Sequence, residues 1–239
     1  MLIGVLETGR PPPALAAEFG DYVDMTAALL SDGEAVRFRR FHVSGGDVPA
    51  VPDSCDAWAI TGSAASVTEE TAWMLRLEAF LRALRDADRP VAGLCFGHQI
   101  LAKALGGIVR PAPQGWQLGL QRYHLTSRPD WLAPERSDLR LAAIHQDQVV
   151  SRPEGATLLA TSDACPVAAL HYGDWAVSFQ AHPEFTLPFE TALIRTLTGA
   201  PLPPDAAGRA LDGLSGPGAV SDGRWIGRSI LRLFRRRRA

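Results

Sequence analysis

The chain has 239 residues, with 24 basic and 26 acidic side chains and a formal net charge of −2. This length predicts one large domain, or one domain with an appendage, and it is enough to bury a core without disulfides. No apolar run approaches the ~18 residues of a membrane-spanning helix, and at this small net charge we expect no nucleic-acid partner.

The first part of the chain alternates between short apolar runs and helical patterns. The runs that predict strands are Leu2–Leu6, Val36–Val43, Ala57–Thr61, Pro90–Cys95, Leu139–Ile144, Thr157–Thr161, Val167–Tyr172 and Trp175–Ala181. Alternation of strand and helix predicts an α/β fold with a mainly parallel central sheet and helices on both faces. The later strands lie closer together along the chain, which predicts a small antiparallel addition.

Three internal segments show the apolar spacing of helices. Residues 69–88 form the longest, with charges opposite an apolar face that holds Trp73, Leu77, Phe80, Leu81 and Leu84. Phe96–Leu105 is followed by Gly106 and Gly107, residues that commonly end a helix. Phe189–Leu197 is the third.

The C-terminal part differs from the rest in composition. Residues 199–223 are rich in Gly, Pro, Ala and Asp, which predicts a loosely packed connection. Residues 224–239 place arginines opposite an apolar stripe, which predicts a helix that docks on its own domain, with a membrane-surface helix as the alternative. We therefore divide the chain into a domain of residues 1–199 and an appendage of residues 200–239.

Cysteine usage indicates the compartment. The three cysteines, Cys55, Cys95 and Cys165, are odd in number and far apart, and residues 1–6 lack the basic start of a secretory signal. We therefore expect reduced thiols and a cytoplasmic location. Cys55 and Cys165 flank predicted strands, and we interpret them as small packing residues.

Cys95 stands in a distinctive turn. The segment Gly93-Leu94-Cys95-Phe96-Gly97 has the form of the G-x-S-x-G turn that exposes a nucleophile between a strand and a helix. The glycines let two backbones approach, and a helix N-terminus favours thiolate over thiol. By itself the motif also fits a buried structural cysteine.

A catalytic thiolate needs a base and a group that orients the base. In the segment His182-Pro183-Glu184, the histidine directly follows a predicted strand, so it is expected at the same sheet edge as Cys95. The stiff proline leaves the Glu184 carboxylate within reach of the imidazole. No Cys/His spacing resembles a zinc site, and no phosphate-binding or dinucleotide motif is present, so we expect neither a metal nor a cofactor.

Together these motifs resemble those of the class I glutamine amidotransferases, including the amidotransferase domain of GMP synthase. The matching segments are G-L-C-F-G-H-Q at residues 93–99, H-P-E at residues 182–184, and I-T-G-S at residues 60–63 with E-T-A-W at residues 70–73. The resemblance covers roughly residues 40–200 and implies a flavodoxin-like fold. It also implies cleavage of a γ-amide through a cysteine thioester.

The resemblance assigns roles to individual residues. It implies that Cys95 is the nucleophile, that His182 is the general base and acid, and that Glu184 orients His182. The backbone N–H groups of Gly62 and Phe96 would form the oxyanion hole.

For substrate binding, the resemblance implies Gln99 on the elbow helix, together with Gln146 and Asp147, where the backbone would grip the amino-acid end. A polar loop after the strand at 139–144 is the alternative interpretation of the segment 145–149. At residues 116–120 the chain departs from the pattern of many relatives, because Gln117 stands for an acid and Leu120 for a tryptophan.

The sequence motifs do not identify the leaving group of the reaction. Glutamine with a separate synthetase partner as ammonia acceptor, and stand-alone hydrolysis of a γ-glutamyl conjugate, both fit the motifs. A catalytically idle regulator that binds a γ-glutamyl metabolite is the non-enzymatic alternative, disfavoured by the presence of all three triad residues. A cysteine enzyme of a related doubly wound family is disfavoured by the His-Pro-Glu segment.

Overall fold

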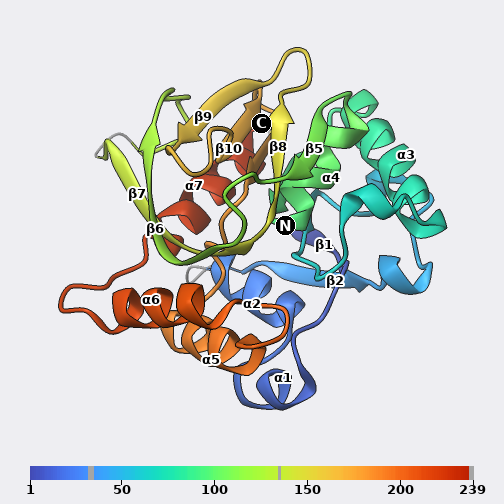
Figure 1. The fold of residues 1–239 in the computed structure, drawn as a ribbon. Coiled ribbons are helices and arrows are strands. Elements are labelled where there is room, and N and C mark those ends of the chain that lie inside the picture. The colour runs from blue at the N-terminus through green and yellow to red at the C-terminus, as the bar shows by residue number, and fades with distance from the viewer. Residues whose placement is uncertain (32–34, 134–135, 237–239) are drawn as a thin grey trace.

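A computed structural model describes residues 1–31, 35–133 and 136–236 (Figure 1). The strands are β1 (Leu2–Leu6), β2 (Arg37–Phe41), β3 (Ala57–Ile60), β4 (Val91–Leu94), β5 (Ile108–Pro111), β6 (Gln117–Leu125), β7 (Asp138–His145), β8 (Asp147–Ser151), β9 (Thr157–Thr161), β10 (Ala169–Tyr172) and β11 (Ala176–Phe179). The α-helices are α1 (Pro13–Phe19), α2 (Tyr22–Leu29), α3 (Ala72–Asp86), α4 (Phe96–Ala104), α5 (Leu187–Leu197), α6 (Pro204–Ser215) and α7 (Gly223–Arg236).

In the described part of the chain, nine strands form one sheet in the order β2-β1-β3-β4-β11-β10-β9-β6-β7. The strands from β2 to β11 pair in parallel, and those from β11 to β7 pair in antiparallel fashion. β5 and β8 form a separate antiparallel pair. The α/β fold with a mainly parallel sheet and an antiparallel addition is therefore confirmed.

Both faces of the sheet are covered, and β3 illustrates why. Ala57 and Ala59 point into one apolar cluster, whereas Trp58 and Ile60 point into another, as the two-residue period of a strand requires. Side chains of α2 and α7 complete the first cluster, and those of α3 and α4 complete the second. Helices on both faces were predicted, and this arrangement confirms them.

Helix α7 is part of the main core. Ile226, Ile230, Leu233 and Phe234 are fully buried in the cluster that holds the strands β1, β3, β4 and β11. The three residues 237–239 at the end of the predicted basic helix lie outside the described residues. None of the described helices combines the length and the apolar character needed to cross a membrane.

The prediction of a loose connection over residues 199–223 is wrong. Residues Pro204–Ser215 form α6, which buries Ala207, Ala210 and Leu214 against β6 and α5. The proline and glycine residues of the segment indicate a loop in sequence, although its alanine and leucine side chains follow a helical spacing. The small side chains allow close packing, because a Cβ on Gly119 of β6 would lie 3.0 Å from the Ala210 Cβ.

Candidate active site

The turn around Cys95 has the geometry of a strained elbow. Cys95 joins β4 to α4 with a φ of 51°, a left-handed conformation that is costly for a residue with a side chain. A Cβ on Gly93 would lie 2.5 Å from the Gly97 carbonyl oxygen, and one on Gly97 would lie 2.6 Å from the Ile60 oxygen. Only glycine fits at either position, as the sequence motif predicts.

Neighbouring strands bring the other candidate residues to Cys95. β4 lies between β3 and β11, and the Cys95 N–H donates to the Phe179 carbonyl at 2.8 Å. Gly62 follows β3, and a Cβ there would lie 2.9 Å from His182 Cε1 and 3.9 Å from Cys95 Cβ. The expectation that His182 lies at the same sheet edge as Cys95 is therefore confirmed.

His182 is fixed from two sides. Its Nδ1 lies 2.7 Å from the Glu184 Oε1, and its ring stacks on Phe185 with centroids 3.9 Å apart and an 8° angle between planes. Burial acts to lower the pKa of His182, but the adjacent Cys95 and Glu184 side chains outweigh it and raise that pKa well above its usual value. These two neighbours therefore favour the protonated form of the imidazole.

Two glutamine side chains, whose hydrogen-bonded pairing the sequence motifs did not predict, connect to the Cys95 sulfur. Gln180 is fully buried, and its Nε2 donates to the Cys95 Sγ at 3.7 Å. Its Oε1 accepts from the Gln99 Nε2 at 3.2 Å, and the same Gln99 amide donates to the Asp147 carbonyl at 2.8 Å. A polar residue at the end of an apolar strand, two positions before His182, was the signal in the sequence.

Phe96 and Gly62 occupy positions suited to an oxyanion hole. Phe96 is the first residue of α4, and the first N–H groups of a helix have no partner within it. Gly62 lies against both Cys95 and His182, because a Cβ on Gly62 would come within 4 Å of each side chain. Both backbone segments therefore lie directly beside Cys95.

The predicted substrate-binding segment is also adjacent to the site, although it is not a simple loop. β7 ends at His145, and Asp147 begins β8, so the polar-loop alternative is wrong for residues 147–149. The Asp147 carboxylate accepts a hydrogen bond from the Ser66 hydroxyl, which ties this segment to the loop after β3. Gln146 is exposed, and its carbonyl accepts from Ala112 N–H.

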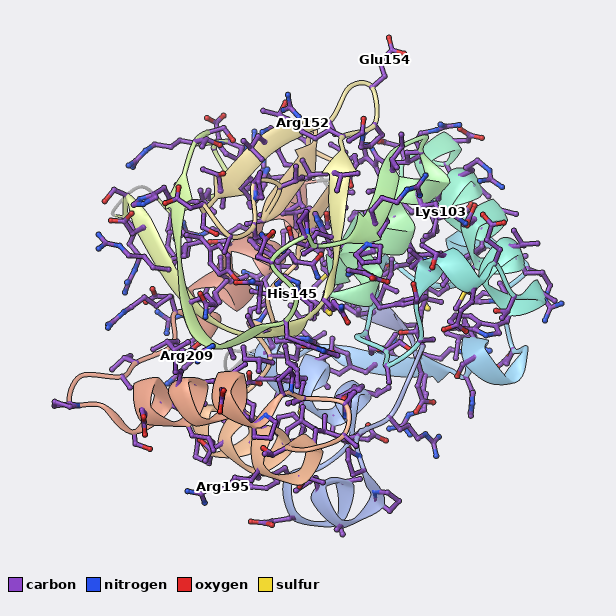
Figure 2. All side chains as sticks on the ribbon, viewed as in Figure 1. Lys103, His145, Arg152, Glu154, Arg195 and Arg209 are labelled. Carbon is purple, nitrogen blue, oxygen red and sulfur yellow. The ribbon has the colours of Figure 1, made fainter. Side chains whose placement is uncertain are left out.

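His145, which is labelled in Figure 2, lines the same cavity as Cys95 and His182. It is 3% exposed, and neither of its ring nitrogens has a hydrogen-bond partner among the described residues. Burial and the nearby His182 charge lower its pKa to about 3, so the ring is neutral at physiological pH. His98, in contrast, has a structural role, because its buried ring is hydrogen-bonded through Nδ1 to the Ser178 hydroxyl at 2.7 Å.

These residues open onto one cavity of about 600 Å³. Its polar part includes Cys95, Gln99, Gln146, Asp147 and His182. The size is typical of small-molecule sites, and the cavity extends well beyond the nucleophile. Every residue predicted from sequence for the triad and for substrate binding lies at this cavity or directly beside it.

Comparison with known proteins agrees with this geometry. Residues 53–196 match the family described as Glutamine amidotransferase class-I. A glutamine amidotransferase-like protein of Schizosaccharomyces pombe is 30% identical over 210 residues, which cover 82% of this chain and 84% of that protein. Gamma-glutamyl peptidase 4 of Arabidopsis thaliana is 33% identical over 176 residues, which cover 70% of this chain and 69% of that protein.

The fold has solved counterparts. A glutamine amido transferase from Methylobacillus flagellatus superposes with a TM-score of 0.73 at 24% sequence identity. The superposition covers 98% of this chain and 94% of that chain, so the two share a fold along almost their whole length.

Proposed function

Because the chain belongs to the class-I glutamine amidotransferase family, we propose that it hydrolyses the γ-amide of glutamine or of a γ-glutamyl conjugate through a thioester on Cys95. The observation that carries this proposal is the strained Cys95 elbow beside a histidine that is bonded to Glu184 at 2.7 Å. Nucleophile, base and orienting group are the three parts that such chemistry needs.

The first half of the reaction forms the thioester. The Cys95 thiolate attacks the γ-carbonyl carbon, and the carbonyl oxygen becomes an oxyanion held by the N–H groups of Gly62 and Phe96. Each such donor is worth about 3–4 kcal/mol of transition-state stabilisation in a well-studied protease. His182 then gives its proton to the departing nitrogen, and the C–N bond breaks.

The second half uses the same groups in reverse. The neutral His182 takes a proton from water, and the hydroxide attacks the γ-glutamyl thioester. The C–S bond breaks, glutamate leaves, and the Cys95 thiolate and the His182 imidazolium are restored. Glu184 keeps the imidazole in one orientation throughout, since its carboxylate accepts from Nδ1 and leaves Nε2 to face the reaction.

Gln180 acts on the reacting sulfur in this scheme. Its amide N–H contacts Cys95 Sγ and stabilises negative charge there, both before attack and as the thioester breaks. Gln99 holds the Gln180 amide in the required orientation and links it to Asp147. Gln99, Gln146 and Asp147 bind the amino-acid end of the substrate.

The remaining parts of the proposal concern the surroundings of the enzyme. Residues 1–199 carry the chemistry, and residues 200–239 add helices that support it. The reduced cysteines favour a cytoplasmic location. A separate synthetase that takes up the released ammonia is the partner to be tested if glutamine itself is the substrate.

The experiment is a measurement of glutamate release by the purified chain from glutamine and from a panel of γ-glutamyl peptides and amines, with Cys95→Ser as the blank. Cysteine-dependent release is the expected result. If no compound is cleaved and a glutamine-analogue electrophile fails to label Cys95, the proposal is wrong and a regulator that has lost catalysis takes its place.

A further inference from the structure

The catalytic cavity has a second, apolar end that glutamine hydrolysis does not use. We name it the amine chamber, and its residues come from the loop after β1, the position before β6, and helix α5 with the turn that follows. They are Pro11, Pro12, Trp116, Leu193, Leu197 and Pro201.

The position of this chamber follows from the chemistry. Gln99 is hydrogen-bonded to Asp147 and connects through Gln180 to the Cys95 sulfur, and the proposed function places the glutamyl group on this side, the polar end of the cavity. Leu193 lies on the other side of the triad, in a cluster with Phe185, whose ring stacks on His182. A γ-carbonyl seated on Cys95 with its amino-acid part at the polar end directs the amide nitrogen away from that end. The substituent on the nitrogen therefore enters the amine chamber.

The walls of the chamber are packed rather than loose. Leu193 is 2% exposed within its cluster. Trp116 and Leu197 are half-buried against the cluster that joins β6, α5 and α6. The chamber is thus formed before a ligand arrives. Helix α5, which follows His182 in the chain, fixes its shape.

Charge restricts what the chamber can take. Among the described lining residues near this end, the charged side chain is Arg10, and its Nε already donates to the buried Glu7 carboxylate at 2.6 Å. An anionic substituent would lose hydration without gaining a dedicated partner, whereas an apolar substituent would bury surface against proline, leucine and tryptophan. Ammonia, the leaving group from glutamine, would gain nothing from these walls.

We propose that the amine chamber binds the amine half of N-substituted γ-glutamyl amides, and that the preferred amine carries a branched or aromatic apolar body. This inference rests on the proposed function, since it concerns the leaving group of the same reaction. Burying a side chain of leucine or phenylalanine size is worth roughly a 10- to 100-fold gain in kcat/KM.

The test compares, on the full chain, two leaving groups of similar size and ammonia. The values of kcat/KM for the γ-glutamyl amide of 3-methylbutylamine, for γ-glutamyl-4-aminobutyrate and for glutamine are measured by glutamate release. We expect the 3-methylbutylamide, whose leaving group is apolar, to exceed both of the others by roughly 10- to 100-fold. Equal values for the apolar and the anionic leaving group, or a preference for glutamine, would contradict the proposed chamber while leaving the proposed hydrolysis intact. Absence of release from all three would overturn both proposals.

Variants locate the preference in the chamber. Leu197→Asp places a charge on its wall and should reduce the ratio of kcat/KM for the apolar leaving group to that for the anionic one to near one. Leu75→Asp introduces the same charge on α3, where Leu75 is 51% exposed, and should leave the ratio unchanged. If Leu197→Asp fails to fold, Trp116→Ala tests the same wall by removing apolar surface. A ratio that stays constant in the folded wall variant would contradict the proposal.

Discussion

The two ends of the cavity are built in different ways. At the catalytic end, the termini of adjacent parallel strands place Gly62, Cys95 and His182 so closely that an added methyl group at Gly62 would collide with the histidine. At the chamber end, side chains from helices and loops form the walls, and several of them are half-exposed. Changes at the catalytic end should therefore abolish the chemistry, whereas changes at the chamber end should alter which substrate is used.

The largest effect is expected at the nucleophile. Cys95→Ser should lower kcat/KM by at least roughly 10⁴-fold with the fold intact, because the thioester cannot form. Glutamate release and circular dichroism measure the two quantities. Cys165→Ala is the matched control, since Cys165 is also buried and burial raises its pKa to about 12, which makes it an inert thiol. Loss of activity in the control alone would move the nucleophile to Cys165.

The next effect concerns the histidine and its carboxylate. His182→Ala should cost more in kcat than Glu184→Gln, because the first removes the proton carrier and the second disturbs its orientation and charge. The Glu184 charge contributes to the raised pKa of His182, so Glu184→Gln should lower that pKa.

This division of roles has a signature in the pH profile. His182 must be protonated to release the amine in the first half of the reaction, so kcat/KM of the wild type should fall as the pH rises through the raised pKa of His182 in the free enzyme. In Glu184→Gln the same fall should begin at a lower pH. A profile with an unchanged alkaline limb would contradict the electrostatic role of Glu184.

Gly62→Ala tests the crowding at the catalytic end directly. The added methyl group would lie 2.9 Å from His182 Cε1, so we expect a loss of roughly 10²- to 10³-fold in kcat, similar to the removal of an oxyanion donor. Gly208→Ala is the control, because its Cβ would meet nothing within 4 Å on helix α6. Similar activity in both variants would show that the backbone at Gly62 can move aside.

A smaller catalytic effect is expected at Gln180. Gln180→Met keeps the length of the side chain but removes the N–H that contacts Cys95 Sγ, and should lower kcat by roughly 10-fold while changing KM less. Gln148→Met is the matched control, since Gln148 is 3% exposed and its amide bonds the Ala164 carbonyl instead. Equal losses would assign Gln180 a purely structural role.

The smallest effect on activity should come from helix α7, far along the chain from the triad. Ile230→Ala removes a fully buried side chain from the main core and should cost about 2–5 kcal/mol of unfolding free energy. Denaturant unfolding measures this cost, with Val220→Ala, at a residue 56% exposed, as the control. A loss of kcat without a loss of stability would mean that α7 acts on the site itself.

The sequence predicted the catalytic end better than the chamber end for a physical reason. The elbow glycines and the His-Pro-Glu segment are local patterns, and parallel strands bring their carboxyl ends to one edge without further information. Gln180 was missed because a single glutamine beside an apolar strand belongs to no local motif, whereas His182 stands in the His-Pro-Glu segment. Its contact with the Cys95 sulfur becomes visible only in the tertiary fold.

Two elements near the cavity were not predicted, and neither was the chamber. The proline and glycine content of α6 indicates a loop, and a single residue separates the end of β7 from the start of β8. The walls at Leu193 and Leu197 belong to a helix that was predicted, but their proximity to residues 10–13 follows from the tertiary fold alone.

The most direct test of the central claim is to trap the intermediate. The chain is mixed with a γ-glutamyl conjugate, quenched with acid within the first turnover, and examined by intact-protein and peptide mass spectrometry. We predict the added mass of one γ-glutamyl group on the peptide that contains Cys95, and its absence in Cys95→Ser. An adduct on another residue, or turnover by Cys95→Ser, would contradict the account.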